Sequence, residues 1–307
     1  MFGAQSEYRP LRKVLMHTPR ESIEQINESS YDRYLFMTPI FKRKFIEEHE
    51  AFVDLLRSEG VDVLLVEDLL KGNEDALTQI RKQPNLTYVR DTISIMRDGY
   101  VRMKMKMKVR APEPRISELA VQRLRIPCLT RIEGNGVLEG GDFVYHDEET
   151  LMIGVGERSN RKGVAMFARR ALQDAITRVI MVPLSTWNVH LDGALMIIDR
   201  GLALGHLNSL RKPATVLERQ RPPRRVDLAK WLKEQQTEVI QVDAYERFMR
   251  GTNVLCLAPR KCVIYRWLTG VSKKLEDHGV DVLEIEGTEL LRGGGGPHCM
   301  TAPILRL

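Results

Sequence analysis

Two distant stretches of this chain are almost the same: Gly60-Val61-Asp62-Val63-Leu64-Leu65-Val66-Glu67 and Gly279-Val280-Asp281-Val282-Leu283-Glu284-Ile285-Glu286. Each follows a segment, residues 41–58 and 267–278, whose apolar residues recur at helical spacing. Each stretch is itself short, apolar and rich in branched residues, which is typical of a strand. The repeated unit is therefore a helix followed by a strand.

The same unit occurs three more times along the chain. Helical segments at residues 116–124, 163–175 and 228–236 lead into predicted strands at residues 126–129, 179–182 and 239–242. After four of the five units a hairpin is predicted, because two apolar runs flank a polar turn. These hairpins cover residues 92–103, 143–153, 194–204 and 254–264.

The fifth hairpin requires both ends of the chain. Residues 301–305 can pair with residues 11–16, and this pairing would complete a ring of five units. A ring of repeats needs no exposed sheet edge between its first and last members. We therefore predict one α/β domain over residues 1–307, built as a closed ring of five pseudo-repeats.

The composition of the chain indicates which partners and which cellular compartment to expect. The 47 basic and 41 acidic residues give a net charge of +6, but the positive charge is dispersed, which disfavours a nucleic-acid partner. The densest basic cluster, residues 219–225, contains two prolines and is predicted to be a solvated loop. No apolar run approaches the about 20 residues that span a bilayer. Four cysteines without metal-ligand spacing suggest a reducing compartment, so we expect a cytoplasmic protein.

Reactive side chains occupy one phase of the repeat, just before each hairpin. Arg90-Asp91 precede the first hairpin, Glu139-Gly140-Gly141-Asp142 the second and His190-Leu191-Asp192 the third. Cys299 precedes the last strand and follows the four glycines of residues 293–296. The fourth unit has Gly251-Thr252-Asn253 there, without a titratable group. Since a closed ring brings equivalent phases to one end of its axis, these side chains should share a cavity.

Four ordered motifs resemble those of the guanidino-group-modifying enzymes of the pentein fold, and among them the arginine deiminases. They are Asn85-Leu86-Thr87-Tyr88-Val89-Arg90-Asp91, the Glu139 to Asp142 turn, the His190 to Asp192 triplet and the glycine-rich loop that ends at Cys299. The resemblance covers nearly the whole chain and implies a five-bladed α/β-propeller. One departure is that only residues 68–84 fill the gap where bacterial arginine deiminases usually carry a helical insertion.

A guanidinium is planar and cationic, so its site needs carboxylates in the plane and a nucleophile aimed at the central carbon. Asp91 and Asp192 are the predicted clamp. Cys299 would attack as a thiolate and form a covalent S-amidino intermediate, activated by the cationic substrate or by nearby positive charge.

His190 would protonate the departing ammonia and then activate a water molecule, because imidazole titrates near working pH. Glu139 is expected to orient His190 and to touch the guanidinium. Asp142 is expected mainly to order the glycine turn, with Arg90 and Gly296 as further support for the site. The remaining histidines are interpreted as ordinary polar residues.

The resemblance also implies how the rest of a substrate is held. Arg110 and Arg158 correspond by position to arginines that bind an amino-acid α-carboxylate, and Asn85 to a partner of the polar backbone groups. Together they favour a free α-amino acid over agmatine, which lacks a carboxylate. Arg110 ends a run in which Met and Lys alternate over residues 103–108, predicted to be a half-buried strand.

We expect hydrolysis of free L-arginine to L-citrulline and ammonia, with no metal and no organic cofactor. The same Cys-His-acid set also fits dimethylarginine hydrolysis, double hydrolysis to ornithine, or amidino transfer to an amine. A silent propeller that binds arginine is the non-enzymatic alternative, and the cysteine argues against it because a binding module needs no nucleophile. The sequence leaves a homo-oligomer open.

Overall fold

The strands form five separate sheets that share one internal order. The computed structural model describes all of residues 1–307. In each sheet two antiparallel strands are followed by a third strand that runs parallel to its neighbour. The sheets are β17 (Ala302–Arg306), β1 (Leu11–Met16) and β2 (Asp62–Leu65); β3 (Ile93–Met96), β4 (Gly99–Arg102) and β5 (Cys128–Arg131); β6 (Phe143–Asp147), β7 (Thr150–Val155) and β8 (Arg178–Pro183), extended by β11 (Ala214–Glu218) and β12 (Arg224–Val226); β9 (Leu195–Asp199), β10 (Leu202–Gly205) and β13 (Glu238–Gln241); and β14 (Leu255–Ala258), β15 (Lys261–Tyr265) and β16 (Asp281–Ile285).

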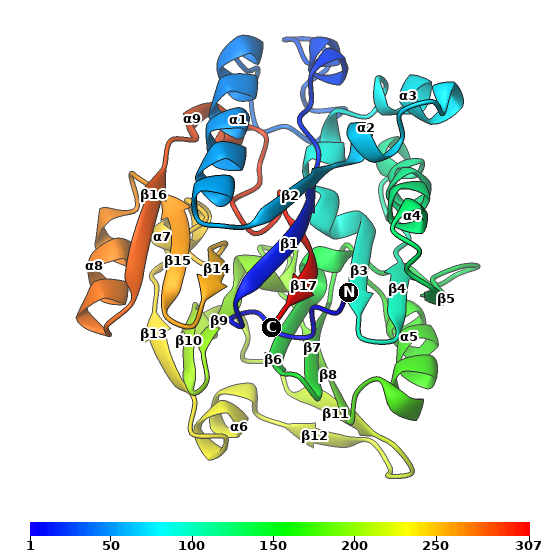
Figure 1. The fold of residues 1–307 in the computed structure, drawn as a ribbon. Coiled ribbons are helices and arrows are strands. Elements are labelled where there is room, and N and C mark those ends of the chain that lie inside the picture. Colours follow the sequence, from blue (N-terminus) through cyan, green and yellow to red (C-terminus); the bar gives the residue numbers. More distant parts are fainter.

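Helices lie at the periphery, as Figure 1 shows for α1, α4, α5 and α8, while β1 and β17 lie near the centre. The longest, α1 (Lys42–Ser58), buries Phe45, Phe52 and Leu56 because these apolar residues recur at helical spacing on one face. No helix combines the length and the apolar character that crossing a bilayer would need. The others are α2 (Val66–Leu69), α3 (Glu74–Ile80), α4 (Glu113–Arg123), α5 (Arg161–Asp174), α6 (Leu228–Glu234), α7 (Ala244–Phe248), α8 (Thr269–Asp277) and α9 (Thr288–Arg292).

The predicted units are present, including the pairing of the two ends of the chain. All four predicted hairpins form, and β1 pairs antiparallel with β17, with Leu15 opposite Ala302. Every sheet nevertheless has open edges and none closes on itself. The structure is therefore a mixed α/β fold of five like sheets, and the closed propeller is not established by strand pairing.

Two segments differ from the sequence prediction. Strand β4 ends at Arg102, and the Met-Lys run beyond it makes only an isolated bridge from Lys104 to Leu138 before a 3₁₀ turn at Lys108–Arg110. Met103 and Met105 are buried as expected. The alternation of Met and Lys therefore predicts correctly which side chains are buried, although the segment is not a continuous strand. The basic cluster is also not wholly a loop, because its last two arginines lie in the exposed edge strand β12.

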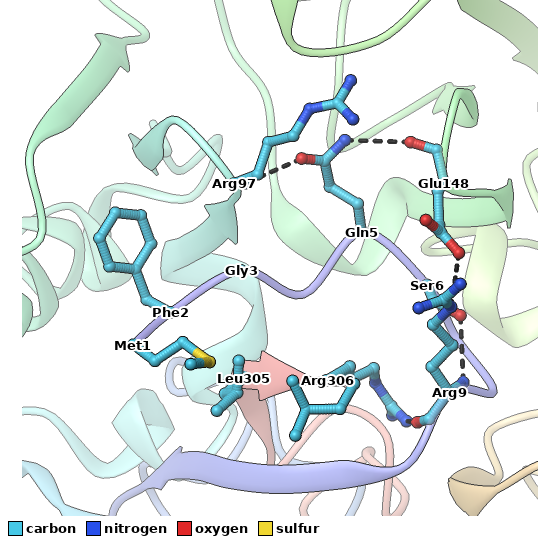
Figure 2. A pocket seen from close by; sticks show the side chains of 11 residues that line it. Met1, Phe2, Gly3, Gln5, Ser6, Arg9, Arg97, Glu148, Leu305 and Arg306 are labelled. Atoms are coloured by element: carbon cyan, nitrogen blue, oxygen red, sulfur yellow. Dashed lines mark hydrogen bonds and ion pairs between the residues drawn. The ribbon is translucent and has the colours of Figure 1, made fainter.

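A hollow of about 210 Å³ lies beside the chain ends, at the far end of β17 from Cys299. Figure 2 shows Gln5 in its wall, where the side chain accepts a hydrogen bond from Arg97 N and donates one to Glu148 O. None of the predicted site residues lines it. At this hollow the N-terminal segment is therefore hydrogen-bonded to the turns of two hairpins, β3–β4 and β6–β7.

Candidate active site

Three short 3₁₀ turns present the predicted residues, each directly before the first strand of a hairpin. Asp91 lies in the turn before β3, Glu139 begins the turn before β6, and His190 begins the turn before β9. Asp192 lies within the last of these turns, and Cys299 stands three residues before β17. The predicted equivalence of position within the repeat is therefore present in the structure.

His190 lies between two carboxylates in the interior. Its Nε2 is 2.8 Å from Glu139 Oε2, and its Nδ1 is 3.6 Å from Asp91 Oδ1. Burial disfavours the charged imidazole, but Asp91 and the hydrogen bond with Glu139 outweigh burial and raise the pKa of His190 from 6.5 to about 10. At neutral pH the ring is therefore an imidazolium that can give up a proton.

Asp91 is held by two donors on opposite sides. Its Oδ2 accepts a hydrogen bond of 2.6 Å from Arg110 Nη1, and its Oδ1 accepts one of 3.1 Å from Gly141 N. Although burial opposes it, the charges of His190 and Arg110 lower the pKa of Asp91. A Cβ at Gly141 would lie 2.6 Å from His190 Nδ1 and 2.8 Å from Asp91 Oδ1, so only glycine leaves room for this contact.

Arg110 is buried and fully engaged by the protein. Its Nε donates to Glu113 Oε2 at 2.9 Å, and its Nη2 donates to the carbonyls of Asn85 and Tyr88. Burial raises the pKa of Glu113 to about 7, although Arg110 works in the opposite direction. The structure therefore places Arg110 against Asp91 and Glu113, and Glu113 is a neighbour that the sequence analysis missed.

Arg158 and Asn85 are the other residues predicted to bind substrate. Arg158 Nη1 lies 3.5 Å from Glu139 Oε2, so this guanidinium borders the site. The side-chain amide of Asn85 donates a 2.7 Å hydrogen bond to Tyr34 O, which fastens the segment before β3 to the loop after β1. Of the two, Arg158 is the one that touches an acid of the site.

Cys299 is half-buried, with its sulfur beside the second predicted clamp residue. Its Sγ is 3.5 Å from Asp192 Oδ2, and its N–H donates a 3.2 Å hydrogen bond to Asn253 Oδ1. Burial, and then the charges of Asp192 and Asp91, raise the pKa of Cys299 well above its ordinary value. The free protein thus carries a neutral thiol. A Cβ at Gly296 would lie 2.6 Å from Asn253 Oδ1, so this glycine allows the contact.

Asp142 joins two loops beneath the site. Its Oδ2 accepts a 2.5 Å hydrogen bond from Ser159 Oγ, and its Oδ1 accepts one of 3.0 Å from Leu191 N. Ser159 Oγ in turn accepts from Glu139 N at 3.0 Å. Burial raises the pKa of Asp142 to about 7. These contacts fit the predicted supporting role.

His298 is the main residue that the sequence analysis did not single out. It is buried, with Nδ1 2.9 Å from Asp192 Oδ2 and Nε2 3.2 Å from Glu7 Oε2. Arg90, predicted as support, donates from Nε to His298 O at 2.9 Å and from its backbone N–H to Cys299 O at 3.3 Å. The only sequence feature that could have pointed to His298 is its position directly before Cys299.

Three of the acids and bases lie close enough to hold a metal ion. The ligand atoms of Asp91, Glu139 and His190 all lie within 4.8 Å of one another. Arg110 and Arg158 already bring positive charge to both carboxylates, and the protonated imidazole donates hydrogen bonds instead of offering a lone pair. The donor set therefore suits an organic cation with N–H groups better than a metal ion.

The profile of the arginine deiminase family matches residues 71–306. The chain belongs to the arginine deiminase family. Arginine deiminase of Borrelia duttonii is 23% identical over 396 residues, covering 98% of this chain and 97% of that protein. Arginine deiminase of Rhodococcus jostii is 25% identical over 393 residues, covering 99% and 97%.

Two solved structures show the same fold. DDAH of Pseudomonas aeruginosa, as a Cys-to-Ser variant complexed with citrulline, is 18% identical with a TM-score of 0.70, covering 96% of this chain and 99% of that one. The N-terminal domain of ArgZ, a cyanobacterial arginine dihydrolase, is 15% identical with a TM-score of 0.71, covering 96% and 97%. This member of the arginine deiminase family is thus an α/β protein of the pentein superfamily and a C–N hydrolase.

Proposed function

We propose that this enzyme hydrolyses free L-arginine to L-citrulline and ammonia through a covalent intermediate on Cys299. One observation carries the proposal: the Cys299 sulfur lies against Asp192 while His190 is held between Asp91 and Glu139, all in one phase of the repeat. A nucleophile, an acid and two carboxylates are what a guanidinium carbon requires. Family membership supports the same reading.

The substrate guanidinium binds between Asp91 and Asp192. Its positive charge offsets the two carboxylates that disfavour ionisation of Cys299, so the thiolate forms when substrate is bound. The sulfur attacks the central carbon, and the imidazolium of His190 donates a proton to one terminal nitrogen. The C–N bond breaks, ammonia leaves and a thiouronium remains on Cys299.

The second half of the reaction reuses His190. The ring, now neutral, takes a proton from a water molecule whose oxygen attacks the thiouronium carbon. The C–S bond then breaks, which gives citrulline and returns the Cys299 sulfur and the imidazolium. No step needs a metal or an organic cofactor.

For the rest of the substrate we assign the α-carboxylate to Arg158, which borders the site beside Glu139. Arg110 contacts Asp91 and Glu113, which favours a role in holding the Asp91 carboxylate in place. Asn85 contacts the carbonyl of Tyr34, which favours a role in holding the loop after β1. A free amino acid is therefore preferred over agmatine, which would leave Arg158 without its partner.

We also propose that the five sheets, within one domain over residues 1–307, surround a common axis as a closed propeller. The shared strand order and the terminal pairing of β1 with β17 support this arrangement. All four cysteines are free thiols, which supports a cytoplasmic location.

Product analysis tests the function directly. Purified protein is incubated with arginine, methylated arginines and agmatine, with and without amine acceptors, and the products are identified by mass spectrometry. Citrulline without ornithine supports the proposal. Ornithine, a transferred amidino group, or preference for methylated arginine would replace it with one of the related reactions. Cys299→Ala is the matched control, expected to bind arginine without turning it over.

A further inference from the structure

His298 lies immediately before the nucleophile, in the interior of the protein. It is 1% exposed, and each of its ring nitrogens faces a different buried carboxylate. Nδ1 lies 2.9 Å from Asp192 Oδ2, and Nε2 lies 3.2 Å from Glu7 Oε2. Because the same Oδ2 atom is 3.5 Å from Cys299 Sγ, the imidazole is one contact away from the reacting sulfur.

The contacts of the ring indicate its protonation state. A neutral imidazole has one N–H and one acceptor nitrogen, so it could satisfy only one of the two carboxylates. An imidazolium donates to both. Arg90 and Arg306 bring further positive charge toward Glu7, whose pKa is lowered to about 2 although burial opposes its ionisation.

The same residue connects loops from distant parts of the chain. Glu7 also accepts a hydrogen bond from Tyr145 N and lies 4.0 Å from Arg90 Nη1. Arg90 Nε donates to the carbonyl of His298 itself. The other charges that face this chain of groups are Arg306 on the Glu7 side and Asp91 on the Cys299 side.

We propose that His298 is a positioning residue for Cys299: its imidazolium holds the Asp192 carboxylate beside the sulfur and compensates the charge of that carboxylate, so that the sulfur can ionise. Asp192 can then pair with a guanidinium without suppressing the nucleophile. The inference rests on the proposed function, because it assigns this help to the attack on a guanidinium carbon. It concerns the thiol of the free protein, however, and is measured there.

A double-mutant cycle on thiol reactivity tests the proposal. Alkylation of Cys299 by iodoacetamide is followed at neutral pH by mass spectrometry of the peptide that contains it, in wild type, His298→Asn, Asp192→Asn and the double variant. The asparagine amide keeps a donor near the position of Nδ1 but carries no charge. His298→Asn should slow alkylation about tenfold in the wild-type background, since a nearby opposite charge shifts a pKa by about 1–3 units. In the Asp192→Asn background the same change should have a clearly smaller effect, because the part of the effect that acts through the Asp192 carboxylate is already lost.

Equal effects in both backgrounds, or none in either, would overturn the proposal. His278→Asn, which removes a surface histidine bonded to Lys274 O, is the matched control and should leave the rate unchanged. Circular dichroism checks that each variant folds. If His298→Asn does not fold, ¹⁵N NMR of the wild-type ring decides: both nitrogens protonated at neutral pH supports the proposal, and a neutral tautomer refutes it. If the alkylation rates show the expected dependence on His298 but the protein makes no citrulline, the proposed function is wrong and the role of His298 still stands.

Discussion

The protonation of His190 is the most direct test of the site's electrostatics. A pKa of about 10 in place of 6.5 corresponds to about 5 kcal/mol of preference for the imidazolium, at 1.36 kcal/mol per pH unit. Burial is the largest influence and lowers this pKa; among the groups that raise it Asp91 contributes most, and Glu139 contributes both a 2.8 Å hydrogen bond and a charge. In Glu139→Gln the amide oxygen still accepts from Nε2, so the hydrogen bond survives and the charge is lost. We expect the pKa of His190 to fall by about 1–2 units.

The assay is an NMR titration of protein labelled with ¹⁵N in its histidines, between pH 5 and 11. The wild-type His190 ring should stay protonated well above neutrality, and Glu139→Gln should lower its midpoint. Asp147→Asn, which removes the carboxylate beside His146, is the control and should leave His190 unchanged. A wild-type midpoint near 6.5 would refute the reasoning, because the two carboxylates would then fail to outweigh burial.

The same shift has a consequence for stability. The folded-state pKa of His190 lies above its unfolded value, so its contribution is fully present below pH 6.5 and is lost as pH rises through about 10. The thermal midpoint should therefore fall as pH rises from 7 to about 10, and it should fall less in Glu139→Gln. An identical pH dependence in both proteins would contradict the assignment.

Other changes have equally specific outcomes. Gly141→Ala should cut turnover about 100-fold by displacing the imidazole, whereas Gly193→Ala, with open space at its Cβ, should stay active; equal rates would remove the steric argument. Deleting residues 302–307 removes the strand that pairs with β1, so the thermal midpoint should fall markedly. A truncated protein that still melts cooperatively near the wild-type midpoint would show that the fold does not need this pairing. Arg110→Met removes the buried cation that pairs with both Asp91 and Glu113, and it should lower the free energy of unfolding in urea by about 3–5 kcal/mol. A loss below about 1 kcal/mol would rule out a structural role for this ion pair. A chelator should leave arginine turnover unchanged, and inhibition reversed by added metal would show that the Asp91, Glu139 and His190 cluster holds an ion.

Much of the fold could be predicted because its signals are local. Helical and strand spacing identified the repeated unit, and turn residues identified the hairpins. Asp91, His190 and Cys299 could be grouped because equivalent positions in a repeat meet in space, although their separation in sequence is large. Two predictions were wrong because the signal used does not determine strand pairing. The alternation of Met and Lys reports burial, but this run makes only one isolated bridge. The prolines of the basic cluster indicate a turn, but the arginines after them pair in β12.

The supporting residues could not be predicted in the same way. Asn253 contacts Cys299 from another loop, and His298 contacts both Asp192 and Glu7, and no spacing pattern encodes such contacts. Glu113 differs, because it lies three residues after Arg110, a spacing at which opposite charges often pair. Arg110 was matched to a substrate-binding position, but its surroundings depend on the buried acids around it. Contacts between distant side chains depend on packing, which the order of residues does not display.

The pairing of β1 with β17 also makes catalytic competence a late event in refolding. It joins Leu11 to Arg306, so the chain must close its longest loop before the strand that follows Cys299 finds its place. Contacts of such sequence separation form slowly, whereas helices and hairpins form early. After dilution from denaturant, the helical signal should recover before arginine turnover does. Spectroscopic recovery alone will then overstate how much working enzyme a preparation contains.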